Sequence, residues 1–107
     1  MAHRDLKSTS VLFTEDGLVK LGDCGLSRWL ECNHAFPIDN VAHVLAPEMW
    51  KGQKYNQKTD IWALGALLYE MMALKRPFKC DSLPALKETV LSGKIPPLPS
   101  HFSQDLR

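Results

Sequence analysis

Apolar positions are densest past the middle of the chain, between residues 60 and 74. Large apolar side chains there fall on every side of a helical wheel, so the pattern predicts a helix that other elements surround. The run is too short for a membrane span of about 20 residues, and we expect no membrane partner. We expect this central helix, 60–74, to be capped by Thr59 or Asp60. Its expected core side chains are Trp62, Leu64, Leu67, Leu68 and Met71.

Two short β-prone runs lie nearer the start of the chain. Residues 11–14 and 18–21 flank an acidic turn sequence that ends in Asp16-Gly17, and such a pattern predicts a β-hairpin over 11–22. Residues 26–45 show no clear period, so we expect a long loop there. Loops of that length in a compact domain are usually functional or mobile.

Proline and glycine positions predict the remaining elements. Pro47 and Gly52 bracket one expected helical turn, because proline suits the first turn of a helix and glycine its end. A following helix is predicted over 83–92, with Ser82 as its cap. Beyond it, a further helix is expected to begin near Ser103. The expected fold class is therefore mainly α (α+β), with one small hairpin.

Composition and charge narrow the class of protein. Apolar residues make up 45% of the chain and charged residues 23%, as in an ordinary globular domain. A formal net charge of +1 gives no reason to expect a nucleic-acid partner. The three cysteines are odd in number and lack disulfide or metal spacing, which favours a reducing compartment. We expect one domain in the cytosol or nucleus.

Five motifs follow one another in an order that is specific as a set. HRDLK at 3–7 precedes the hairpin, which is followed by GDCG at 22–25, APE at 46–48 and DIWALG at 60–65. With these motifs in this order, the chain resembles a protein kinase. The stretches LVKLGD, YNQKTDIWALG, LLYEM, LKRPF and SGKIPP most resemble the NIMA-related serine/threonine kinases.

The resemblance covers nearly the whole chain but only part of a kinase. It implies a large-lobe fragment from which the small ATP-binding lobe is absent, because no glycine-rich loop, strand lysine or partner glutamate is present. It also implies ATP and Mg²⁺ as cofactors and a protein substrate. A cytoplasmic location is expected, with association to the cytoskeleton or cilium left open. The implied divisions of this partial kinase domain, 1–107, are a catalytic loop 3–10, the hairpin 11–22, an activation segment 23–48, the central helix 60–74 and the following helix 83–92.

The resemblance assigns roles to four side chains. Asp5 would orient the substrate hydroxyl and accept its proton, and Lys7 would bind ATP and neutralise the transferring phosphate. Asp23 would hold Mg²⁺ against the nucleotide phosphates, although an Asx-turn at the strand end would also explain it. Ser10 stands where the family has an asparagine that ligates a second Mg²⁺. A serine hydroxyl is a poorer ligand, so we expect metal binding that is weakened but not abolished.

Three other positions affect how the site is switched. Cys24 replaces a phenylalanine, which weakens the packing that sets active against inactive loop positions. Val41 replaces a threonine and loses a hydrogen bond to the catalytic pair. Residues 28–48 contain no Ser, Thr or Tyr, so a phosphate that could pair with Arg4 cannot form there. Switching by phosphorylation of this loop is therefore excluded.

The resemblance also links the central helix to the catalytic loop. Asp60 would accept hydrogen bonds from the backbone near His3 and Arg4, although a simple helix cap would suit it equally. Glu48 pairs in the family with an arginine beyond Arg107, so we expect it to lack that partner. Three functional hypotheses follow: a serine/threonine kinase, a pseudokinase-like or truncated binding module, and an incomplete gene product. Exposed apolar faces are a candidate surface for a protein partner.

Overall fold

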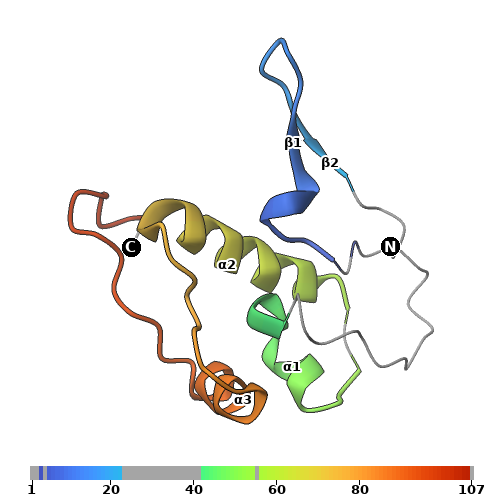
Figure 1. The fold of residues 1–107 in the computed structure, drawn as a ribbon, viewed down its shortest axis with the longest axis vertical. Helices are drawn as coiled ribbons and strands as arrows, with labels where there is room; N and C mark the ends of the chain where they lie inside the picture. Colours follow the sequence, from blue (N-terminus) through green and yellow to red (C-terminus); the bar gives the residue numbers. More distant parts are fainter. Residues whose placement is uncertain (1–2, 4, 23–41, 55, 107) are drawn as a thin grey trace.

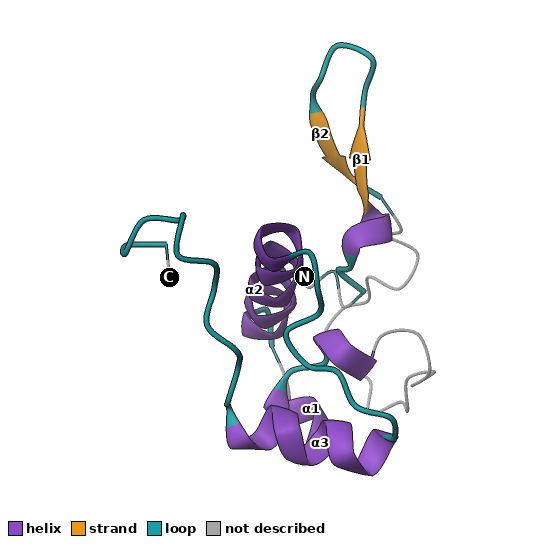
Figure 2. Ribbon diagram, turned by 60° about the vertical axis from the view of Figure 1, so that its left-hand side comes forward, coloured by secondary structure: helices purple, strands orange, loops and turns teal. Residues whose placement is uncertain are grey.

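The computed structural model describes residues 3, 5–22, 42–54 and 56–106. Figure 1 and Figure 2 show a hairpin that projects from a group of packed helices, and in Figure 1 the chain after α3 turns back toward the C-terminal end of α2. The described part is mainly helical with one two-stranded sheet, as predicted. Its strands are β1 (Val11–Phe13) and β2 (Val19–Leu21), and its α-helices are α1 (Pro47–Trp50), α2 (Lys58–Ala73) and α3 (Leu83–Ser92).

The hairpin predicted over 11–22 is confirmed. Strands β1 and β2 pair antiparallel, with Leu12 opposite Lys20. The Thr14 and Leu18 backbones close the turn with an N–H to carbonyl bond of 2.9 Å. Gly17 within it has a φ of +82°, which a residue without a Cβ adopts most easily. The Asp-Gly sequence is therefore the local cause of the reversal.

Helix α2 begins two residues before the predicted start, and the predicted cap is wrong. Its N-cap residue is Gln57, whose side chain makes no capping bond. The Asn56 Oδ1 instead accepts the Lys58 N–H at 2.8 Å. Thr59 and Asp60 lie inside the first turn, where their side chains bond to other segments of the chain.

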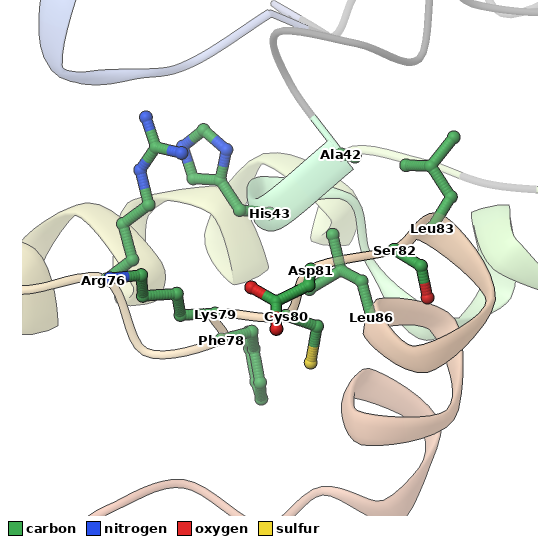
Figure 3. Close-up of a pocket in the computed structure, with 10 residues that line it drawn as sticks. All are labelled: Ala42, His43, Arg76, Phe78, Lys79, Cys80, Asp81, Ser82, Leu83 and Leu86. Carbon is green, nitrogen blue, oxygen red and sulfur yellow. The ribbon is translucent and has the colours of Figure 1, made fainter.

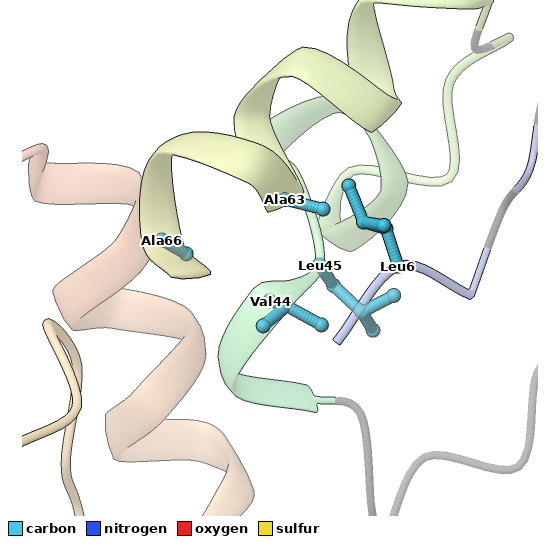
Figure 4. Close-up of a cluster of buried hydrophobic side chains, with 5 residues drawn as sticks. All are labelled: Leu6, Val44, Leu45, Ala63 and Ala66. Carbon is cyan, nitrogen blue, oxygen red and sulfur yellow. The ribbon is translucent and has the colours of Figure 1, made fainter. Parts of the chain in front are cut away.

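The core consists of two clusters that meet at α2. In the first, small side chains on α2 let a loop and a 3-10 helix, Ala42–Val44, approach closely (Figure 4). The second lies between that 3-10 helix and α3, where Trp62 of α2 stacks on Phe78 with ring centroids 6.0 Å apart. The first cluster holds Leu6, Val44, Leu45, Ala63 and Ala66, and the second holds Ala42, Phe78, Leu86 and Val90.

The predicted core of α2 is only partly correct. Leu67 is buried and Trp62 half-buried, but Leu64, Leu68 and Met71 are 49%, 45% and 62% exposed. The described elements pack on the side of α2 that carries its alanines, and they leave the leucine and methionine stripe uncovered. The expectation that an apolar face remains exposed is therefore confirmed.

The elements after α2 agree with the sequence except at the end. Helix α3 spans the predicted residues, its Ser82 cap accepts the Ala85 N–H at 3.4 Å, and Gly93 ends it with a φ of +67°. The helix expected to begin near Ser103 is not formed. The described residues there make turns only. Within the ranges that the structure describes, no helix has the length and apolar character needed to cross a bilayer.

Candidate functional site

The segment before the hairpin folds into a tight loop with its polar groups paired. The loop ends in a 3-10 helix, Ser8–Ser10, closed by the Ser10 N–H bond to the Lys7 carbonyl at 2.9 Å. The Ser10 side chain is fully buried, and its hydroxyl donates to the Asp5 carbonyl at 2.9 Å. These bonds hold the backbone on both sides of Lys7 in one conformation.

Asp5 and Lys7 form an ion pair in this loop. The Lys7 ammonium donates to Asp5 Oδ2 at 2.8 Å, and the two side chains are 28% and 11% exposed respectively. A carboxylate that reaches solvent on one side can accept a proton from a bound molecule, and the neighbouring cation can bind an anionic group. The sequence predicted these two side chains for one site, and the structure brings them together.

His3 joins this loop to two distant parts of the chain. Its backbone N–H donates to Asp60 Oδ2 at 2.7 Å, across 57 positions of sequence. Its ring Nε2 donates to the Gly22 carbonyl at 2.8 Å, while its Nδ1 accepts the Asp5 N–H at 3.4 Å. A carbonyl can only accept, so these contacts require the tautomer with the proton on Nε2.

The bond from His3 fits the resemblance and not the alternative of a simple cap. Asp60 accepts from the loop backbone, as the resemblance implies, whereas the cap position belongs to Gln57. Leu6, which lies between Asp5 and Lys7 in the chain, packs into the first core cluster. A charged hydrogen bond to Asp60 and the buried Leu6 side chain are therefore among the contacts that hold the loop.

Some of the residues predicted for the site lie in the described part of the chain, and others do not. Asp5, Lys7 and Ser10 lie within one loop, but Asp23, Cys24 and Val41 lie outside the described residues, as does Arg4. The Gly22 N–H donates to the Ser10 carbonyl at 2.8 Å, so the end of the hairpin is joined to the end of the loop. The roles assigned to these side chains remain predictions.

The oxygen atoms of the described residues can be compared with the ligands that Mg²⁺ requires. Mg²⁺ prefers oxygen ligands, and of the two predicted ligands only the Ser10 hydroxyl lies in the described part. Its side chain is fully buried and its hydroxyl donates to the Asp5 backbone carbonyl, an arrangement that suits a structural hydrogen bond better than metal ligation. Among the described residues, no three His, Cys, Asp or Glu side chains gather in a way that could hold a metal.

Two polar contacts were not anticipated from the sequence. The expectation for Glu48 concerned only an arginine partner, and the bond that its Oε1 accepts from the Thr59 hydroxyl at 3.1 Å, which ties α1 to α2, was not foreseen. The His3 ring was not singled out, although its place at the head of a dense polar cluster was a signal that the sequence contained. Both contacts link segments that are distant in sequence, which no local pattern encodes.

Comparison with known proteins agrees with this geometry. The protein kinase domain family matches residues 1–105, so the chain belongs to the protein kinase family. It is 44% identical to putative serine/threonine-protein kinase A of Trypanosoma brucei brucei, with all of this chain matched. It is 44% identical to the mouse serine/threonine-protein kinase Nek3 and 41% identical to mouse Nek1, with 98% of this chain matched in each case. The predicted resemblance to NIMA-related kinases is confirmed.

The relatives are much longer than this chain. The match spans 26% of the trypanosome kinase, 21% of Nek3 and 9% of Nek1. The activity of a whole kinase is therefore a proposal for this chain and not a finding.

Proposed function

We propose that this chain forms the substrate-handling part of the large lobe of a serine/threonine protein kinase. The complete reaction would move a phosphoryl group from ATP to a serine or threonine of a protein substrate. One observation carries the proposal: the His3 N–H bond to the Asp60 carboxylate at 2.7 Å. It supports the arrangement that the kinase resemblance requires, in which the loop of Asp5 and Lys7 is fixed to the central helix.

In this proposal Asp5 and Lys7 are the side chains that act on the substrate and the phosphate. Asp5 orients the substrate hydroxyl and accepts its proton as the phosphoryl group is transferred. Lys7, 2.8 Å from that carboxylate, turns its positive charge to the transferring phosphate and contacts ATP. The buried Ser10 bond supports this role, because it keeps the Asp5 backbone from moving.

Mg²⁺ and ATP are the proposed cofactors. Asp23 and Ser10 would hold Mg²⁺, which supplies neutralising charge for the nucleotide phosphates. The Ser10 hydroxyl already donates to the Asp5 carbonyl, and this supports a weaker site than an amide carbonyl would make. The cytoplasm is the proposed location. We do not extend the proposal to an association with the cytoskeleton or cilium.

A second candidate is a pseudokinase-like module that binds partners without transferring phosphate. The burial of Ser10 favours it, because a fully buried side chain is placed for structure rather than for contact with a nucleotide. The replacements at Cys24 and Val41 point the same way. This candidate shares the fold of the first and differs only in the chemistry.

The two candidates are separated by nucleotide binding and phosphate transfer. The full-length protein that carries this chain, mixed with Mg²⁺ and ATP, is expected to unfold at a higher temperature than without them. It is expected to label a serine/threonine substrate from γ-labelled ATP. Asp5→Asn keeps the side-chain size but removes the base, so it should lower the transfer rate by about 100-fold or more.

The matched control is Asp105→Asn, an exposed carboxylate outside the site, which should leave the rate unchanged. A protein that shows neither the thermal shift nor the label is not a kinase, and the binding module then stands.

A further inference from the structure

A second cavity lies outside the loop of Asp5. Its volume is about 300 Å³, and it opens between the 3-10 helix Ala42–Val44 and the chain that enters α3 (Figure 3). Its apolar wall comes from the second core cluster, through Ala42, Phe78 and Leu86. Its polar lining is basic in character and consists of His43, Arg76, Lys79, Asp81 and Ser82, beside the sulfur of Cys80.

The charges in this lining do not balance. Arg76 and Lys79 are permanent cations, and Asp81 is the single carboxylate that lines the cavity. Among the described residues, none of these three forms an ion pair or a side-chain hydrogen bond. The cavity therefore holds more positive than negative charge, and its donors are free to bind a ligand.

Arg76 and His43 lie together at one side of the cavity (Figure 3). Figure 3 shows the guanidinium beside the imidazole ring, away from the Asp81 carboxylate. Burial and then the charge of Arg76 lower the pKa of His43, although Glu70 acts in the opposite direction. Two nitrogen-bearing groups thus lie together, and the carboxylate that acts on His43, Glu70, is not among the residues that line the cavity.

The cavity adjoins the loop through the first core cluster. Leu6, the neighbour of both Asp5 and Lys7, packs in the same cluster as Val44 and Leu45. His43 comes directly before Val44 in the 3-10 helix. The loop of Asp5 and the 3-10 helix beside the cavity are therefore packed against each other through this buried cluster.

We propose that this cavity binds an anionic side chain, a carboxylate or a phosphate, of the protein that presents its hydroxyl to Asp5. The Arg76 guanidinium offers two parallel N–H donors to such a group, and Lys79 adds a second charge. The apolar wall accommodates the carbon stem of the ligand side chain. The identity of the ligand as a substrate rests on the proposed function, whereas anion binding does not.

Peptide binding tests the proposal without ATP. The probes are fluorescent peptides that share one serine-containing sequence and carry asparagine, aspartate or phosphoserine, in turn, at each position near that serine. Binding to the full-length protein is measured by fluorescence anisotropy. At the best position the aspartate and phosphoserine peptides should bind about tenfold more tightly than the asparagine peptide, because their bonds to Arg76 are charge-assisted. This gain should shrink as salt is added.

Variants then locate the effect. Arg76→Gln should remove most of the gain, and Arg76→Gln combined with Lys79→Gln should abolish it. Both side chains are exposed, so these proteins are expected to fold. Lys87→Gln removes one exposed cation of α3 that does not line the cavity, and it should keep the full gain.

Each result has a definite meaning. Tighter binding of both anionic peptides, or of one alone, supports the site and names the source of the anion as carboxylate, phosphate or either. Equal binding of all three peptides overturns the proposal, as does a gain that Lys87→Gln removes as fully as Arg76→Gln. Phosphate transfer without anion preference leaves the proposed function intact and rejects the cavity, whereas anion preference without transfer does the reverse.

Discussion

At the scale of single residues, the Asp60 carboxylate connects the central helix to the loop of the candidate site. It lies in the first turn of α2, and it accepts the backbone N–H of His3. A hydrogen bond to a charged group contributes roughly 1.5 to 3 kcal/mol, more than an ordinary one. Together with the buried Leu6 side chain, this carboxylate holds the loop against α2 and the core.

Asp60→Ala is therefore expected to release the first dozen residues from α2. Amide hydrogen exchange of the loop should quicken by about tenfold or more, since the lost bond is worth at least about 1.5 kcal/mol. Exchange in α3, which is distant from the bond, should stay unchanged. Asp105→Ala serves as the control for loss of a carboxylate, and equal protection in both variants would contradict the role of Asp60.

His43 gives the molecule a dependence on pH at the same scale. Its ordinary pKa is 6.5, and burial together with Arg76 lowers it in the folded chain, with Glu70 opposing. As the pH falls below 6.5, the unfolded chain takes up the proton first, which favours unfolding. The stability contributed by neutral His43 is therefore complete above that pH and is lost as the pH falls through the folded pKa.

The check is urea unfolding at several values between about pH 7.5 and about pH 5. The midpoint should fall with pH less steeply in His43→Gln than in the unaltered protein. The exposed His101, changed to Gln, should give the slope of the unaltered protein. Identical slopes in all three proteins would show that His43 is not shielded in solution.

At the scale of elements, α2 ends in an unfavourable way. Leu74 closes the helix with a φ of +53°, a left-handed conformation that a side chain with a Cβ rarely adopts. This leucine is 89% exposed, so little packing compensates for the strain. The end of α2 is thus a place where a single substitution should help.

Leu74→Asn is expected to raise the free energy of unfolding by about 1 kcal/mol, because asparagine tolerates this conformation better. Met71→Asn is the matched control, since it also replaces an exposed apolar side chain of α2 but at a helical position. That control should be neutral or destabilising, because asparagine is a poorer helix former. A loss of stability in Leu74→Asn would indicate that Leu74 is packed in solution.

At the scale of the whole molecule, one side of α2 has no covering element in the described chain. An apolar cavity of about 580 Å³ also lies against α2, beside Gly65 and Ile95. At this cavity the Trp62 Nε1 and the Tyr69 hydroxyl are buried with no hydrogen-bond partner among the described residues. Such a face is prone to association with other surfaces.

Gly65→Ala tests whether that face is open in solution. A Cβ added at Gly65 meets no atom within 4 Å, so the variant should gain up to about 1 kcal/mol in helix propensity. Gly52→Ala also meets open space, but its φ of +65° should make that variant less stable. Urea unfolding with sedimentation at the same concentrations measures both effects. A destabilised Gly65→Ala would mean that a second surface covers the helix there.

The elements that the sequence predicted correctly are those marked by residues that act on their neighbours in the chain. The hairpin, α1 and α3 are marked by Gly17, Gly52, Pro47, Ser82 and Gly93, which act on neighbouring residues, and these elements form where expected. The buried side of α2 could not be found in the same way. An apolar residue on every face gives no direction, and the packing depends on which segments return to the helix.

The candidate site likewise contains local contacts that the sequence predicted and long-range contacts that it did not. A motif within five residues placed Asp5 and Lys7 in one site, and the structure shows the two side chains 2.8 Å apart. The bonds of His3 to Gly22 and of Glu48 to Thr59 join separate segments, and a single sequence does not show which segments meet. The basic cavity likewise combines His43 with Arg76, more than 30 positions later, and only the fold brings them together.

The bond between His3 and Asp60 uses a peptide N–H, and this has a consequence for mutational tolerance. Every amino acid except proline offers that donor. In a complete substitution scan, proline at position 3 should therefore stand apart from the other replacements, which lose only the ring contacts to Gly22 and Asp5. At position 60 the pattern should reverse: the acceptor belongs to the side chain, so that codon should tolerate few exchanges.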